Sequence, residues 1–189
     1  MATTYEKKGD HKFFIVVQTD SYTKYLECFI DKGKRTREEE EELITGCVIH
    51  LLAESCHLKY DLPKIQEEIK INQVDAEKSW KKLFNNKVGF ISNNKNKPEL
   101  IFPGSFNPLH EGHLKMKELA EKKTGMHTTF EICAKNADKP PLTFFEIKRT
   151  IDQFQNDESW MLTSAGRFSE KVEMFPNSVF IIGADTLLR

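Results

Sequence analysis

Two histidines three residues apart, His110 and His113, give the strongest chemical signal in the chain. They follow a turn that begins at Gly104, and a short apolar run at residues 100–102 precedes that turn. An apolar run of this length between two prolines favours a buried strand, and the good helix formers of residues 114–123 favour a helix after the turn. The pattern therefore predicts a strand-to-helix turn with both histidines at the start of the helix.

A helix start of this kind is suited to phosphate chemistry. Its free N–H groups and positive dipole end attract anions, and Gly112 lets the backbone approach a ligand closely. His110 and His113 can face one ligand from the first helical turn and donate hydrogen bonds to phosphate oxygens whose charge grows in a transition state. Such chemistry needs alignment and charge stabilisation, and no protein nucleophile. Nucleotide transfer is therefore the leading hypothesis.

Other interpretations of the same residues fit less well. A zinc-protease helix has histidines four residues apart, whereas His110 and His113 are three apart. A nucleophile elbow places its serine two residues from each flanking glycine, whereas Ser105 directly follows Gly104. A lone histidine is most often a solvated or core imidazole, but here two occur together behind a strand and a turn.

Residues 104–113, with the letters GSFNPLHEGH, resemble the HxGH nucleotidyltransferase (cytidylyltransferase-like) superfamily. The GSFNP sequence is most similar to that of the nicotinamide and nicotinate mononucleotide adenylyltransferases of this superfamily. The resemblance implies a Rossmann-like domain in which a mononucleotide phosphate attacks the α-phosphorus of ATP and pyrophosphate leaves. It implies Mg²⁺ held by the nucleotide phosphates and no protein metal site. It also implies His110 and His113 as catalytic residues and a nucleotide pocket that includes Gly104, Ser105, Phe106 and Gly112. Class I aminoacyl-tRNA synthetases share the HxGH letters, but their second, lysine-rich signature is not found.

The remaining segments of the C-terminal half alternate between strand and helix patterns. We expect strands at residues 128–134, 160–162 and 179–182, the last one buried, and helices at residues 143–155 and 167–175. Thr143 and Glu146 form a capping box at the start of the first of these helices. Such alternation predicts an α/β fold with a parallel sheet and right-handed crossovers, with ligands beyond the carboxyl ends of the strands.

Three further residues are weighed as ligand contacts. Asp185 follows the last expected strand, where the resemblance implies an aspartate against bound nucleotide, although an ordinary loop or cap aspartate fits nearly as well. Lys139 lies in a proline-stiffened loop and could contact phosphate, with a solvated lysine as the default. Arg149 is expected to be solvated or salt-bridged.

The N-terminal half predicts a hairpin of two strands, at residues 12–18 and 21–30, and a helix. Thr36 and Glu39 form the capping box of that helix, which carries an apolar stripe at helical spacing: Leu43, Ile44, Cys47, Val48, Leu51 and Leu52. Residues 9–11 and 32–39 look like the last part of a CinA-type domain, a family that includes nicotinamide mononucleotide deamidases. A small accessory cap unrelated to that family is the alternative.

These patterns divide the chain into three parts. Residues 1–60 form a partial α+β CinA-like segment, 61–97 a helical connector and linker, and 98–189 the nucleotidyltransferase-like domain. The connector is expected to hold two helices within residues 61–85, and the domain boundary is placed at residues 92–98. We expect truncation at both ends, because the catalytic part of a CinA-like domain and the closing Ser-x-Thr-x-x-Arg motif of adenylyltransferases are not found.

Composition limits the function classes. The formal net charge of −1 gives no general attraction to nucleic acid or to an anionic membrane. No secretory or transmembrane segment is found, and the four cysteines lack metal-binding spacing and read as reduced thiols. A cytoplasmic location and a small nucleotide substrate are expected.

Three functions remain open from the sequence. The first is an adenylyltransferase that uses ATP and nicotinamide or nicotinate mononucleotide. The second is a nucleotide-binding module without transfer activity, because the closing motif is absent. The third is an assembly surface in the N-terminal segment, where an unpaired hairpin edge would seek a partner strand in a homo-oligomer.

Overall fold

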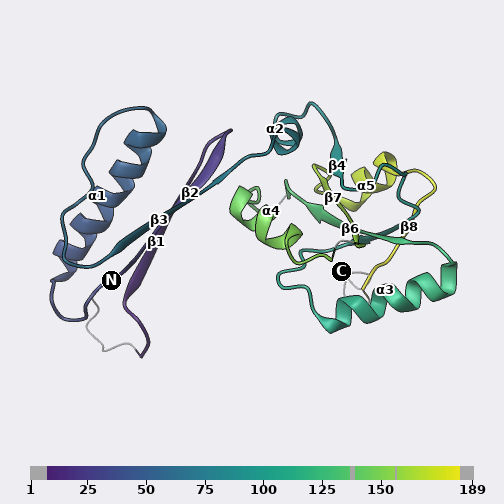
Figure 1. The fold of residues 1–189 in the computed structure, drawn as a ribbon, viewed down its shortest axis with the longest axis horizontal. Coiled ribbons are helices and arrows are strands. Elements are labelled where there is room, and N and C mark those ends of the chain that lie inside the picture. The colour runs from purple at the N-terminus through teal and green to yellow at the C-terminus, as the bar shows by residue number, and fades with distance from the viewer. Residues whose placement is uncertain (1–7, 137–138, 156, 184–189) are drawn as a thin grey trace. The chain divides into compact units, whose positions relative to one another are not determined.

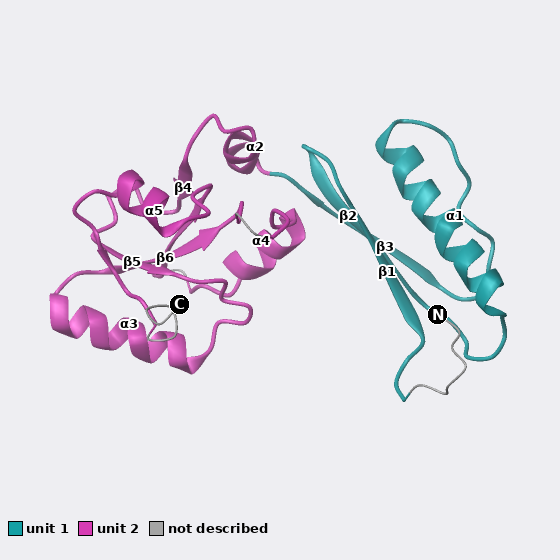
Figure 2. Ribbon diagram, turned by 180° about the vertical axis from the view of Figure 1, so that it is seen from behind, with its two compact units in different colours: residues 1–76 teal, residues 77–189 magenta. Residues whose placement is uncertain are grey.

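The computed structural model describes residues 8–136, 139–155 and 157–183. The chain forms two compact units, residues 1–76 and 77–189, coloured separately in Figure 2. The division therefore lies after Ala76, upstream of the boundary expected at residues 92–98. The assignment of each part to a family-like domain stays a prediction.

The first unit is a three-stranded antiparallel sheet with one helix. Its elements are β1 (Lys12–Gln18), β2 (Tyr22–Phe29), α1 (Arg37–Ser55) and β3 (Ile69–Asp75), and the strand order is β1-β2-β3. The predicted hairpin is confirmed. Of the two helices expected within residues 61–85, one is present at Lys78–Phe84, but the other is wrong, because residues 69–75 pair with β2 along their whole length. The letters IKINQVD alternate apolar with polar side chains at first and carry β-branched residues, which suits a strand at a sheet edge.

Helix α1 begins and packs as its sequence predicts. The Thr36 hydroxyl accepts the N–H of Glu39, and the Glu39 carboxylate accepts the N–H of Thr36. Leu43, Cys47 and Leu51 are buried against the sheet, together with residues of β1 and β2. The apolar stripe is narrower than expected, since Leu52 is 52% exposed.

The second unit is built on a five-stranded sheet. Its elements are α2 (Lys78–Phe84), β4 (Phe90–Ser92), β5 (Leu100–Pro103), α3 (Glu111–Thr124), β6 (Thr128–Cys133), α4 (Phe144–Ile151), β7 (Ser159–Thr163), α5 (Phe168–Met174) and β8 (Val179–Phe180). The strand order is β4-β7-β6-β5-β8, and all neighbours are parallel except β4 and β7. The predicted α/β class is confirmed, with the correction that one edge strand is antiparallel.

The order of the parallel strands creates a switch point between β5 and β8. The chain leaves β5 towards β6 and β7, and then returns past β5 to β8 on the other side. The two connections place α3 and α5 on opposite faces of the sheet (Figure 1). Ligands of open α/β sheets bind beyond the carboxyl ends of strands at such a point. The turn after β5 occupies that position.

Strand β8 is shorter and less buried than expected. It spans two residues, and one further ladder bond runs from the N–H of Ile181 to the carbonyl of Ile101 at 2.8 Å. Val179 is 42% exposed, because β8 forms an edge of the described sheet. The expectation of a buried strand at residues 179–182 is therefore wrong, because Val179 is exposed and the other three residues are only partly buried.

Candidate functional site

The turn between β5 and α3 is anchored by a buried aromatic ring. Phe106 is 1% exposed and packs edge-on against Phe102, Phe130 and Phe154. Its backbone φ is +45°, in the left-handed region that costs a non-glycine residue about 1–3 kcal/mol. The Phe106 side chain thus points into the core, and its backbone alone is left to face a ligand.

Gly104 is required by the position of that ring. A Cβ atom at Gly104 would lie 2.6 Å from Cζ and 2.7 Å from Cε1 of Phe106. Such distances are far inside van der Waals contact, and the buried ring has little room to move. The glycine that opens the motif is therefore explained by close packing of the turn on itself.

The two histidines lie face to face at the start of α3. Their ring centroids are 3.7 Å apart, with an interplanar angle of 23°. His110 is the N-cap residue of α3, and its backbone N–H donates to Nδ1 of His113 at 3.3 Å. A neutral imidazole that accepts at Nδ1 carries its proton on Nε2. The geometry therefore makes Nε2 of His113 a hydrogen-bond donor.

The surroundings of His113 favour its neutral imidazole. Burial lowers the pKa of His113 below its ordinary value, and the nearby His110 lowers it further. The ring also contacts Phe106 edge-on, with centroids 5.1 Å apart, and Phe102 at 6.0 Å. His110, in contrast, is exposed. The pair thus combines a half-buried imidazole, whose Nδ1 accepts a backbone N–H, with an imidazole open to solvent.

Backbone N–H groups complete this anion-attracting surface. In the part of the chain that the structure describes, no acceptor takes the N–H of Ser105, Phe106, Glu111 or Gly112. The last two are the first N–H groups of a 14-residue helix, whose positive dipole end favours negative charge. A Cβ at Gly112 would lie 3.0 Å from Cε1 and Nδ1 of His110, so this glycine leaves space for the imidazole.

Two side chains from the α4 region fasten the turn. The Gln153 amide bonds the backbone of Phe106 and Leu109, and the Arg149 guanidinium donates to Oδ1 of Asn107. Arg149 was expected to be solvated or salt-bridged, and Gln153 was not among the predicted site residues. No local pattern marks these residues, because their partners lie more than 40 positions away.

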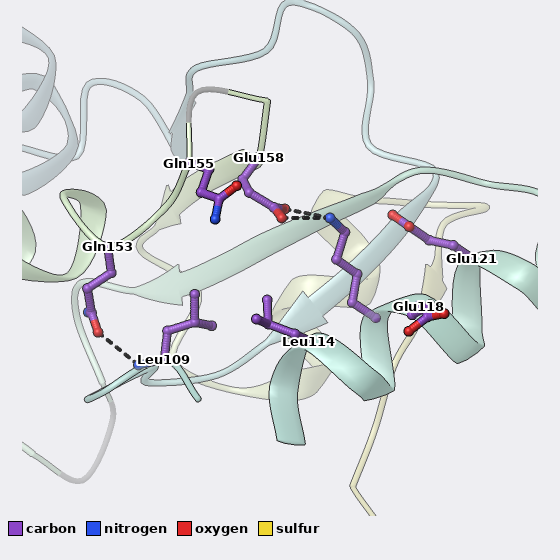
Figure 3. A pocket seen from close by; sticks show the side chains of 8 residues that line it. Leu109, Leu114, Glu118, Glu121, Gln153, Gln155 and Glu158 are labelled. Carbon is purple, nitrogen blue, oxygen red and sulfur yellow. Dashed lines mark hydrogen bonds and ion pairs between the residues drawn. The ribbon is translucent and has the colours of Figure 1, made fainter. Parts of the chain in front are cut away.

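A cavity of about 350 Å³ lies beside the turn, between α3 and the segment that leads into β7. Figure 3 shows Gln153 bonded to Leu109 at one side of the cavity. Lys117 and Glu158, which also line the cavity, form an ion pair. Both oxygens of Glu158 accept from Lys117, at 2.7 and 2.8 Å. Neither His110 nor His113 lines the cavity, so it is distinct from the surface that the histidines form.

The other predicted contacts are placed only in part. Lys139 is exposed in the loop between β6 and α4, and the described part of the chain gives it no hydrogen bond. Asp185 lies outside the described residues. Searching the described residues finds no group of three or more His, Cys, Asp or Glu side chains that could hold a metal ion. In those residues no helix is both long and apolar enough to cross a membrane.

Comparison with known families gives one match. Residues 101–189 match the model of the Cytidylyltransferase-like family, and the match includes β5 except Leu100, the histidine turn and α3. No curated protein and no solved structure matches the chain. Residues 101–189 are therefore similar to a cytidylyltransferase-like domain.

Proposed function

We propose that the second unit transfers an adenylyl group from ATP to a mononucleotide and releases pyrophosphate. The observation that carries the proposal is the stacked pair His110 and His113 at the start of α3, with the proton of His113 directed to Nε2. An oxygen of the acceptor phosphate attacks the α-phosphorus of ATP. The bond from that phosphorus to the bridging oxygen breaks, and the electron pair leaves with pyrophosphate.

The residues of the turn suit the charges of this reaction. Negative charge grows on the triphosphate oxygens as the bridging bond breaks, and donors already in position stabilise it without reorganisation. The Nε2–H group of His113, the His110 imidazole and the free N–H groups of Glu111 and Gly112 are such donors. Mg²⁺ bound to the triphosphate would supply additional charge neutralisation.

Nicotinamide or nicotinate mononucleotide is the proposed acceptor. This choice rests on the Gly-Ser-Phe-Asn-Pro wording of residues 104–108, which resembles the adenylyltransferases of these mononucleotides. Gly104, Ser105, Phe106 and Gly112 would border the nucleotide, with Lys139 and Asp185 as further proposed contacts. The turn supports the first four, because Gly104, Ser105 and Phe106 directly follow β5 and Gly112 lies in the first turn of α3.

The resemblance of the first unit to a CinA-type domain remains a proposal of its own. Its support is the wording of residues 9–11 and 32–39 and an α+β arrangement of three strands and one helix. If both units serve pyridine nucleotides, deamidation and adenylylation of one mononucleotide would be consecutive reactions. The strand edges of β1 and β3 are the proposed place for association with a second copy.

Pyrophosphate release by the purified chain tests the proposal. The chain is incubated with Mg²⁺ and either ATP or CTP, with nicotinamide or nicotinate mononucleotide as acceptor. His110→Ala and His113→Ala are each expected to lower the rate by about 10²–10³, the usual effect of removing one charge-stabilising donor. His127→Ala, which changes an exposed histidine at another position, is the matched control.

The pattern of rates separates the possible outcomes. Acceptor-dependent release with ATP that both site variants abolish supports the proposal. Release with CTP alone would refute the choice of ATP. Equal rates in wild type and both site variants would refute the site. Binding of ATP without release would favour the nucleotide-binding module.

A further inference from the structure

The side chain of Gln153 forms hydrogen bonds with both ends of the segment 106–109, which directly precedes His110. The Nε2 group of Gln153 donates to the carbonyl of Phe106 at 3.0 Å. The N–H of Leu109 donates to Oε1 of Gln153 at 2.8 Å. In the described part of the chain no other group bonds this carbonyl or this N–H. A primary amide fits the task because it offers one donor side and one acceptor side.

This segment needs external support. Phe106 has a φ of +45°, a conformation that a non-glycine residue keeps only when its surroundings fix it. The residues of the turn form no regular ladder between the end of β5 and the start of α3. Gln153 therefore supplies bonds that the backbone of the turn does not supply for itself.

Gln153 is attached to a helix that is packed firmly into the core. Gln153 follows α4, whose Phe144 and Ile147 are completely buried. The first turn of α4 is closed by a capping box between Thr143 and Glu146. A side chain that reaches out from such a packed element can fix its partners more closely than a loop residue can.

Two contacts couple the position of residues 106–109 to the positions of His110 and His113. The ring of Phe106 packs edge-on against the imidazole of His113, with centroids 5.1 Å apart. Leu109 directly precedes His110, whose own N–H bonds Nδ1 of His113. A shift of the segment would therefore displace both imidazoles relative to the start of α3.

We propose that Gln153 is a positioning residue that fixes residues 106–109 and so sets the placement of His110 and His113. This inference rests on the proposed function for its consequence in catalysis. It concerns the geometry of the turn directly, so it can be tested without any transfer activity.

The test compares Gln153→Met, which removes both bonds, with Gln153→Glu, which keeps an acceptor for Leu109 and loses the donor to Phe106. The matched control is Gln155→Met, since Gln155 lines the same cavity and the described residues give its side chain no hydrogen bond. Imidazole ¹H–¹⁵N NMR signals of His110 and His113 are recorded in the full chain. Rates of pyrophosphate release are measured on the same samples.

We expect both Gln153 variants to shift the His113 ring signals, with Gln153→Met shifting them more, and Gln155→Met to leave them unchanged. A misplacement of about 1 Å can cost up to about 10²-fold in rate, so kcat should fall by about 10- to 100-fold in Gln153→Met. KM for ATP should change far less, because the lost interaction acts on alignment.

Unchanged His110 and His113 signals in folded Gln153→Met would overturn the proposal, whatever the rates. If Gln153→Met does not fold, Gln153→Glu decides in the same way. If the rate falls only because fewer molecules are folded, the His110 and His113 signals of the folded fraction will match those of wild type. This result would also overturn the proposal. Shifted signals in a chain whose wild type releases no pyrophosphate would support positioning while the proposed function fails.

Discussion

Replacing Gly112 with alanine should separate activity from stability. The new methyl group would lie 3.0 Å from Cε1 and Nδ1 of His110. Ordinary carbon contacts lie at about 3.5–4.0 Å, so the imidazole must move by about 0.5–1 Å to relieve the contact. Because His110 is exposed, the ring is free to make this movement, and the cost falls on its alignment with the substrate.

The catalytic rate and the stability of the fold are expected to change in opposite directions. A misplacement of about 1 Å can cost up to about 10²-fold in rate, so Gly112→Ala should lower kcat/KM by about 10- to 100-fold. Gly112 lies within α3 and is exposed, and alanine is favoured over glycine inside a helix by up to about 1 kcal/mol. The free energy of unfolding should therefore stay level or rise while the rate falls.

The assay combines pyrophosphate release with urea unfolding on the same preparations. Lys122→Ala, a change near the other end of α3, serves as the control for a surface alanine on this helix. A Gly112→Ala protein with the wild-type kcat/KM would refute the idea that this glycine makes room for His110. A protein destabilised by more than about 1 kcal/mol would show that Gly112 serves packing instead.

Three further predictions concern the stability of the two units. Gly104→Ala places Cβ 2.6 Å from a buried ring carbon and should cost about 1–3 kcal/mol by overpacking, measured by thermal unfolding; an unchanged melting temperature would contradict this. Lys171→Met leaves the completely buried Glu131 carboxylate without its cationic partner at 2.5 Å. Urea unfolding should show that the free energy of unfolding falls by about 3–5 kcal/mol. Much of this loss should be recovered when Glu131→Leu is added. The Arg35 guanidinium lowers the pKa of Glu67 to about 2, so this pair stabilises the fold above the unfolded value of 4.5 and the gain is lost as pH falls towards 2. Arg35→Gln should therefore flatten the dependence of stability on pH between about 4.5 and 2, and an unchanged slope in acid unfolding would contradict the assignment.

Local signals in the sequence were sufficient for the main elements of the second unit. The capping box of Thr143 and Glu146 marks the start of α4, and Gly125 ends α3 in a left-handed conformation with φ of +70°. These features depend on residues a few positions apart, and a single sequence contains them. The alternation of strands and helices was likewise enough for the α/β class.

Features that depend on distant partners were missed. Leu62, Ile65 and Ile69 have helical spacing, but the first two pack in a loop and Ile69 begins β3, because strand β2 offers a ladder for residues 69–75. The role of Gln153 depends on Phe106 and Leu109, which lie 47 and 44 positions away. Propensity and periodicity describe neighbours along the chain and give no information on contacts between distant residues.

The fate of the α-phosphorus of ATP tests the central claim most directly. The purified chain is incubated with Mg²⁺, ATP labelled at the α-phosphate and nicotinamide or nicotinate mononucleotide, and the labelled species are separated. The account predicts label in a dinucleotide product with wild-type protein and with His127→Ala, and loss of that product with His110→Ala and with His113→Ala. Label that remains in ATP, or that appears in AMP without the dinucleotide, would contradict adenylyl transfer by this site.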